Sequence, residues 1–258
     1  MAIGGLWVLH SPLLGVHRVV VVGRSELSEP ALLASAGIRV DEPLIDVSPL
    51  RAQRRLEAVP WVATARVERR WPSSLRIYLS VRHPVGQVAR GSSAQGPVAL
   101  VDSSGRVVAE SPSPVQGLPL LVGAGPAVPL GHWLAGSPGS GSAGDRVAGA
   151  SRSAAALALA AQLDADHLSA TEVAVGADGT ASAVIAGGAT VVSFGSAAQL
   201  PAKVRVLRVL SADGYLRGAA RVDLAVPERP TVTPGGSGRA GAAGRSAGAA
   251  GTSGNGKG

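Results

Sequence analysis

The residues that most often carry catalysis or metal binding are few in this chain and widely scattered. None of its histidines has the spacing of paired metal ligands; they are His10, His17, His83, His132 and His167. Cysteine is absent, which excludes disulfides, thiol nucleophiles and cysteine-based metal sites. We therefore predict that the protein holds no metal and no cofactor.

Other patterns that could support an enzyme fail in their context. Asp164 and Asp166 lie two residues apart at the end of a predicted helix, so their side chains diverge and do not form an acid–base pair. Two Gly-x-Gly-x-x-Gly matches, at residues 139–144 and 236–241, lie in low-complexity segments with no strand before them. A Gly-x-Ser-x-Gly nucleophile motif is absent from the sequence. We predict a protein without catalytic residues.

The composition predicts an aliphatic core and a mildly basic exterior. Hydrophobic residues make up 46% of the 258-residue chain, yet it has one Phe, two Tyr and four Trp. The formal net charge is +7, and nearly all basic residues are arginine, which with the many Ala and Gly is typical of a G+C-rich genome. Anionic lipid or cell wall suits this charge better than nucleic acid, because no basic motif is interleaved with aromatic residues.

The first third of the chain predicts a compact α+β unit. The order is β-α-α-β-β, with expected elements at residues 16–22, 28–36, 48–58, 62–69 and 75–82. In the fourth element we expect Ala63, Ala65 and Val67 to share one face. The last element alternates cleanly, and its inward residues are Leu75, Ile77, Leu79 and Val81. Two helices covering one face of a three-stranded sheet would complete this unit.

Residues 85–230 predict a mostly antiparallel β domain with helices. A hairpin is expected at residues 98–110, and residues 111–146 read as a long loop that contains a strand at 118–122. The further elements are a helix at 153–163, strands at 171–175, 181–186 and 189–194, a helix at 199–210 and a last strand at 221–226. Residues 231–258 form a Gly/Ala/Ser tail that buries too little to order itself.

The N-terminal segment is short and apolar. Residues 1–9 would rise about 14 Å as a helix, roughly half the thickness of a bilayer core. It lacks the basic region and the cleavage site of a signal peptide. We interpret residues 1–14 as the outer half of a transmembrane helix whose remainder is encoded upstream. The alternative is a short hydrophobic N-terminus packed on the domain.

An ordered set of short motifs resembles one family. The motifs are VVVVG at 19–23, AGI at 36–38, PLIDV at 43–47, LEAVPWV at 56–62, ARVERRWP at 65–72, SLRIYL at 74–79 and RHPV at 82–85. Weaker matches follow at 100–107, at 193–195, at Lys203 with Leu207, and at 222–224. Over about residues 12–230 the chain resembles the FtsQ family of bacterial cell division proteins, also called DivIB, from an actinobacterium-like source. The family usually has Glu-Arg-x-Pro where this chain has Val81, Arg82, His83 and Pro84.

The resemblance implies a POTRA domain at residues 15–84, followed by the family's β domain. It also implies a single-pass protein of the cytoplasmic membrane, with its bulk outside the cytoplasm at the division septum. Its partners would be small bitopic coiled-coil proteins and septal wall synthases, and it would have neither catalytic activity nor a cofactor. In the family, partners bind the last strands of the β domain. By position this indicates Arg221, Val222, Asp223, Leu224, Ala225 and Val226.

Two other functions remain open at this point. One is a POTRA-containing transport or assembly factor that binds client polypeptides, which would usually carry several POTRA units. The other is a secreted wall-modifying enzyme, which lacks its catalytic residues here. We interpret the arginines on the predicted elements of the first unit as solvated faces; they are Arg51, Arg54, Arg55, Arg66, Arg69, Arg70 and Arg76. We expect the strand at 221–226, followed by Pro227 and Pro230, to form an open sheet edge.

Overall fold

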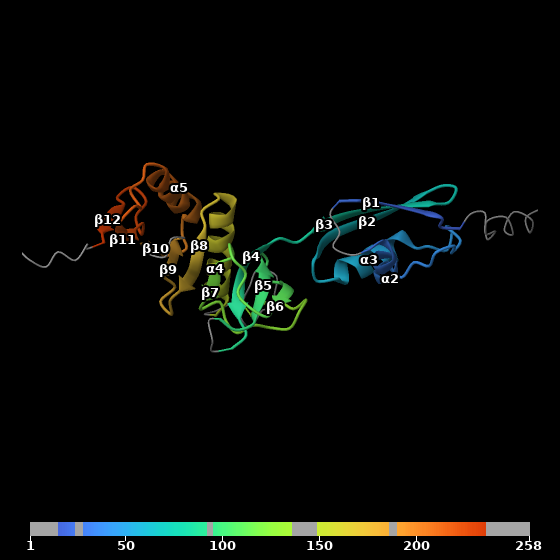
Figure 1. Ribbon diagram of the computed structural model, residues 1–258, viewed down its shortest axis with the longest axis horizontal. Helices are drawn as coiled ribbons and strands as arrows, with labels where there is room; N and C mark the ends of the chain where they lie inside the picture. The colour runs from blue at the N-terminus through green and yellow to red at the C-terminus, as the bar shows by residue number, and fades with distance from the viewer. Residues whose placement is uncertain (1–14, 24–27, 92–94, 136–148, 186–189, 236–258) are drawn as a thin grey trace, which may run out of the picture.

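The chain forms two lobes in a row, which meet where it passes from β3 to β4 (Figure 1). The computed structural model describes residues 15–23, 28–91, 95–135, 149–185 and 190–235. Each lobe has its own hydrophobic core, one within residues 16–79 and the other within residues 85–224. No helix in these ranges is both long and apolar enough to cross a membrane. The predicted half-helix at residues 1–14 lies outside the described residues.

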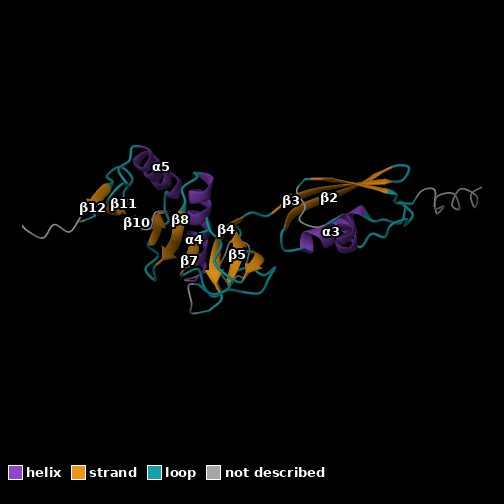
Figure 2. Ribbon diagram, in the orientation of Figure 1, coloured by secondary structure: helices purple, strands orange, loops and turns teal. Residues whose placement is uncertain are grey.

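The first lobe has the predicted β-α-α-β-β order. Its elements are β1 (Arg18–Val22), α2 (Glu29–Ala36), α3 (Pro49–Ala58), β2 (Val62–Arg70) and β3 (Ser74–Val81). The sheet order is β1-β3-β2, with β1 parallel and β2 antiparallel to β3. Both helices lie on one face of this sheet (Figure 2). The opposite face carries no element in this view.

Local sequence signals position both helices. Helix α3 begins at Ser48, whose hydroxyl accepts a hydrogen bond from the Arg51 amide, and Pro49 occupies its first turn. Helix α2 ends at Gly37, which adopts the left-handed conformation with φ of 68° that glycine tolerates best. The most deeply buried side chains of this lobe are Leu32, Leu44, Leu56, Leu75 and Ile77.

The predicted inward face of β2 is wrong at one residue. Pairing with β3 shifts between Val62 and Thr64, which is a β-bulge at Ala63. The bulge moves the alternation by one position, so Val62 is buried together with Ala65 and Val67, while Ala63 is half-buried. The sequence alternation beyond the bulge holds.

The second lobe is built on one nine-stranded sheet. Its strands are β4 (Pro84–Ala89), β5 (Val98–Asp102), β6 (Val107–Ser111), β7 (Leu120–Val122), β8 (Ala170–Val175), β9 (Ala181–Ile185), β10 (Thr190–Gly195), β11 (Ala219–Asp223) and β12 (Thr231–Pro234). They lie in the order β12-β11-β10-β9-β8-β7-β4-β5-β6. Most pairs are antiparallel; β4 with β7, β7 with β8 and β10 with β11 are parallel. The predicted α+β class is confirmed.

Two helices pack on this sheet and supply much of its core. They are α4 (Gly149–Ala165) and α5 (Leu200–Ala212), both close to their predicted positions. Leu157 and Leu163 of α4 and Leu207 of α5 are fully buried with Phe194 of β10. The large aliphatic residues of each helix therefore fix it to the sheet.

The sequence did not predict β4. Its central residues Val85, Gly86, Gln87 and Val88 are all buried, so the strand has no polar alternation that would reveal it. Gly86 is needed there, because a Cβ atom would lie 2.8 Å from the Leu121 side chain of the neighbouring strand β7. The Gln87 side-chain amide donates to the carbonyls of Val115 and Leu118 and so holds the long loop against the sheet.

The first lobe's core makes a quantitative prediction. Leu56 is fully buried, whereas Leu50 on the same helix is 57% exposed. We expect Leu56→Ala to lower the free energy of unfolding by about 2–5 kcal/mol, because it leaves a cavity. Leu50→Ala is the matched control and should change it by less than about 0.5 kcal/mol. Urea unfolding followed by circular dichroism measures both; equal effects would contradict this packing.

Candidate partner-binding edge and interdomain junction

The residues predicted to bind partners lie at the far end of the second lobe, but they do not form its edge. Strand β11 covers Ala219–Asp223, so the strand predicted at 221–226 begins two residues earlier and ends three residues earlier. Strand β12 (Thr231–Pro234) pairs antiparallel with β11 on its outer side. The expectation of an open edge at 221–226 is therefore wrong, and the first four residues of the predicted tail form the edge strand instead.

Burial divides the six predicted residues into two groups. Val222 and Leu224 are fully buried in the core of the lobe, and the Leu224 amide donates to the Ser193 carbonyl at 2.7 Å. The other four side chains are exposed; they are Arg221, Asp223, Ala225 and Val226. The Asp223 carboxylate accepts a hydrogen bond from the Ala225 amide and so fixes the turn that leaves β11.

The two edges of the nine-stranded sheet differ. At the β6 edge, the loop at residues 131–134 covers the start of the strand: Val107 exchanges backbone hydrogen bonds with His132 and Gly131 at 2.8 and 2.9 Å. At the β12 edge, no strand follows within the described residues. Val232 of β12 packs against the core, whereas Thr231, Thr233 and Pro234 are exposed. Within the part of the chain that the structure describes, the sheet therefore presents unpaired backbone groups at β12.

A buried lysine supports this end of the sheet. Lys203 of α5 is almost fully buried, and its ammonium group donates to the carbonyls of Phe194 and Ser196 at 2.7 and 2.9 Å. Burial lowers the pKa of Lys203, and the nearby Asp223 carboxylate acts in the opposite direction. The lysine thus stabilises the end of β10. Strand β11 pairs with β10, and β12 pairs in turn with β11.

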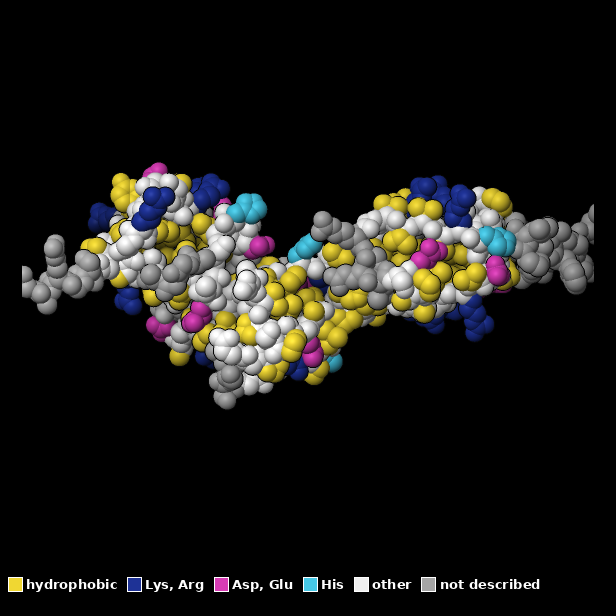
Figure 3. All heavy atoms as spheres, viewed as in Figure 1, with side chains coloured by type: hydrophobic (Ala, Val, Ile, Leu, Met, Phe, Trp, Pro, Cys, Tyr) yellow, Lys and Arg dark blue, Asp and Glu magenta, His cyan; other side chains and the backbone are white. Residues whose placement is uncertain are grey.

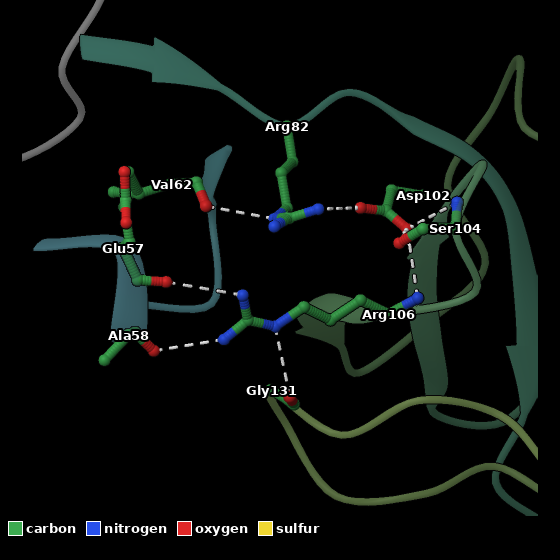
Figure 4. A network of polar contacts seen from close by, with 8 residues as sticks. All are labelled: Glu57, Ala58, Val62, Arg82, Asp102, Ser104, Arg106 and Gly131. Carbon is green, nitrogen blue, oxygen red and sulfur yellow. Dashed lines mark hydrogen bonds and ion pairs between the residues drawn. The ribbon is translucent and has the colours of Figure 1, made fainter. Parts of the chain in front are cut away.

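A second polar cluster lies where the two lobes meet (Figure 4). Arg106, at the start of β6, is buried and extends across the junction to the C-terminal end of α3. Its guanidinium donates to the Ala58 carbonyl at 3.1 Å and to the Glu57 carbonyl at 3.5 Å, and to the Gly131 carbonyl of its own lobe at 3.1 Å. A cation at the C-terminal end of a helix is favourable, because free carbonyls gather there.

Aromatic contact and charge complete the environment of Arg106. The Trp133 ring lies 4.9 Å from its guanidinium carbon, within the range of a cation–π contact. Burial lowers the pKa of Arg106, as does the nearby positive charge of Arg82, while the Asp102 carboxylate raises it. Asp102 is therefore the counter-charge of the junction.

Asp102 links the hairpin of β5 and β6 to the connection between the lobes. One carboxylate oxygen accepts from the amide and hydroxyl of Ser104 and from the Arg106 amide, at 2.9, 2.6 and 3.0 Å. The other oxygen accepts from Arg82 at 2.7 Å, and Arg82 also donates to the Val62 carbonyl of β2. Arg106 thus extends from the second lobe to the first, and Arg82, in the connection, contacts both lobes.

Asp166, one of the two aspartates that were not expected to form an acid–base pair, has two side-chain partners. Its carboxylate accepts a hydrogen bond from Gln162 of α4 at 2.7 Å and another from Arg208 of α5 at 3.1 Å, and the second links the two helices. Across the described ranges, no three histidine or acidic residues converge as metal ligands.

The first lobe defines a class of domain. Residues 14–80 match the family model of the FtsQ-type POTRA domain. This match covers nearly all of the β-α-α-β-β unit, from just before β1 to one residue before the end of β3.

Curated relatives are named cell division protein FtsQ. The protein from Zymomonas mobilis is 33% identical over 129 residues, which are 48% of this chain and 39% of the relative. That from Streptomyces bingchenggensis is 32% identical over 120 residues, 46% of this chain and 44% of the relative. That from Mycobacterium tuberculosis is 32% identical over 81 residues, 31% of this chain and 26% of the relative. The resemblance to FtsQ proteins that the motifs indicated is confirmed over the matched segments. These segments span less than half of the relatives.

The junction makes a prediction about rigidity. We expect Arg106→Ala to loosen the lobes, because it removes the hydrogen bonds to Glu57 and Ala58, and to lower the free energy of unfolding by about 2–3 kcal/mol. Small-angle X-ray scattering should show a broader distribution of maximum dimensions. Arg208→Ala is the control, since Arg208 lies outside the junction, its side chain is 55% exposed, and an ion pair of this kind is worth about 0–1 kcal/mol. An unchanged scattering profile for Arg106→Ala would rule out this role.

Proposed function

We propose that this protein is a non-enzymatic scaffold of the bacterial cell division machinery. In this proposal it recruits and links septal cell-wall synthesis proteins through contacts outside the cytoplasm. The observation that carries the proposal is an FtsQ-type POTRA domain joined to a β domain whose sheet ends at β12, with no further strand beside it among the described residues. The similarity to FtsQ proteins of three bacteria supports it.

Strand addition is the mode of binding that the fold favours. An extended segment of a partner pairs with the outer edge of β12, where main-chain hydrogen bonds give affinity and side chains on the neighbouring strand give specificity. Arg221 and Asp223 of β11 are exposed beside this edge and can select the charge of the partner. In the proposal, the predicted site at residues 221–226 thus becomes the second row of the interface, behind β12.

The proposed partners are small bitopic coiled-coil division proteins and the septal wall synthases. The proposed location is the cytoplasmic membrane at the septum, with a single N-terminal membrane helix and both lobes on the outer side. The edge at β12 and the N-terminal lobe lie at opposite ends of the molecule (Figure 1). A membrane-attached protein of this shape would present its partner edge far from the N-terminal attachment.

Cellular location tests the division role directly. We expect a fluorescent fusion of the complete gene to concentrate at midcell in dividing cells, because a scaffold must be present where the septum forms. Fluorescence microscopy beside a septal wall stain measures the enrichment. A uniform membrane signal in cells with visible septa would refute the scaffold role.

The edge is tested by blocking it. We expect the double variant Thr231→Lys and Thr233→Lys to reduce capture of the coiled-coil division proteins at least tenfold, because two charges on an edge strand discourage pairing. Ser113→Lys with Gln116→Lys adds the same charge to an exposed loop elsewhere and should bind normally. Pull-down from detergent-solubilised membranes measures both. Equal capture by the two variants would exclude the β12 edge.

A further inference from the structure

The face of the first sheet that is not covered by helices has an unusual set of side chains. Register between the strands places Val22, Tyr78 and Arg66 in one row across the sheet. Val22 and Arg66 are exposed and Tyr78 is partly exposed, whereas the alternating residues Ile77 and Val67 are buried against the helices. We name this surface, built from the outward residues of β1, β3 and β2, the open sheet face.

The two neighbouring rows of the open sheet face add mostly positive charge. One row holds Val20, Arg76 and Glu68, and the next places Arg18 and Arg70 on either side of Ser74. With Arg66 from the first row, the face carries four arginines and one acidic residue. Its formal charge is therefore +3, nearly half of the whole chain's +7.

The single acid does not neutralise the face. Glu68 is shared between Arg66 at 2.9 Å and Arg70 at 3.0 Å, and among the described residues neither Arg18 nor Arg76 forms an ion pair. A hydrogen bond from Arg76 lowers the pKa of Tyr78, and a hydrogen bond from Arg70 acts in the same direction. These hydrogen bonds link the phenol to the arginines of the face.

Exposed aliphatic side chains lie among the charged ones on the open sheet face. Val20 and Val22 are 38% and 42% exposed, although they lie in the middle and at the end of β1. Figure 3 shows basic side chains of this lobe along its lower edge and, next to hydrophobic ones, along its upper edge. This is the edge where β1, β2 and β3 lie in Figure 1. The open sheet face is therefore both basic and partly apolar.

We propose that the open sheet face docks on an anionic lipid surface, with its arginines on lipid phosphates and its two valines at the headgroup boundary. Arginine matches phosphate with paired hydrogen bonds, and a basic surface with exposed aliphatic groups is the chemistry of proteins that lie on membranes. The proposal rests on the membrane attachment proposed above.

The length of the N-terminal connection makes this contact possible. Residues 10–17 separate the apolar segment 1–9 from Arg18, the first residue of β1. Eight extended residues reach at most about 29 Å, so an apolar segment in a bilayer keeps β1 within that distance of the headgroups. An acidic protein segment is the competing occupant, but it would gain little from two isolated valines on a flat face.

Vesicle binding tests the proposal on the full chain. The measurement is co-flotation with vesicles of phosphatidylcholine alone and with phosphatidylglycerol added. We expect added phosphatidylglycerol to strengthen binding of the wild-type chain, and high salt to remove that gain. Arg66→Gln with Arg76→Gln should weaken binding to the anionic vesicles roughly twentyfold, at roughly fivefold for each arginine.

A control variant separates the open sheet face from net charge. Arg51→Gln with Arg54→Gln removes the same charge from the exposed face of α3, on the other side of the sheet. It should retain the response to phosphatidylglycerol. Equal losses in the two double variants, or a loss in neither, would overturn the proposal.

Two further arms identify the occupant. Val20→Thr with Val22→Thr keeps the charge and the strand propensity, and should weaken vesicle binding several-fold. Binding of the wild-type chain to poly-glutamate, without a response to phosphatidylglycerol, would overturn the proposal in favour of an acidic protein partner. Binding to neutral vesicles reports separately on the apolar segment 1–9, so failed membrane attachment and a failed open sheet face give different results.

Discussion

The carboxylate of Asp102 is the interaction on which the arrangement of the two lobes depends. It accepts four hydrogen bonds, three from its own hairpin and one from Arg82, and its charge offsets two arginines at a mostly buried junction. Removing one partner from such a network leaves the remaining charges buried and uncompensated, which is more costly than any one hydrogen bond suggests. The hydrogen bonds of the junction therefore form together or are lost together.

The end of α3 completes this joint. The last carbonyls of a helix have no partner within it, and here Arg106 of the other lobe supplies one. The helix is itself fixed to the first sheet by Leu56, so packing in one core is transmitted to the hairpin of the other. The second sheet then extends without interruption from β6 beside the junction to β12 at the far end.

Much of the fold could be predicted from the sequence because local signals agreed with one another. The alternation of Leu75, Ile77 and Leu79, the proline start at Pro49 and the glycine stop at Gly37 each specify one structure. Strand β4 could not be predicted, because a strand buried on both faces shows no alternation. Strand β12 is four residues long and lies in sequence typical of the tail, so the sheet edge was predicted one strand too far inward.

The junction could not be predicted either. Arg106 binds main-chain carbonyls 48 and 49 residues away, and a carbonyl acceptor has no residue type that a sequence could display. The DSSGR segment indicated a hairpin turn, which is correct, but not the arginine's second role. The one local signal is the position of Asp102 four residues before Arg106. It indicates only the bond from the Arg106 amide to the Asp102 carboxylate, because an aspartate in a turn usually accepts from nearby amides.

The joined lobes also give the molecule a length that acts as a ruler. With the POTRA sheet at one end and β12 at the other, and under the proposed function, a rigid joint would set the distance from the N-terminal membrane attachment at which a partner strand is captured. Segments shorter than that distance would not reach the edge, however well their sequence matched it. Partner segments would then be selected by their reach before they are selected by their sequence. The hydrogen bonds of Asp102, which hold the two lobes together, would determine the reach required.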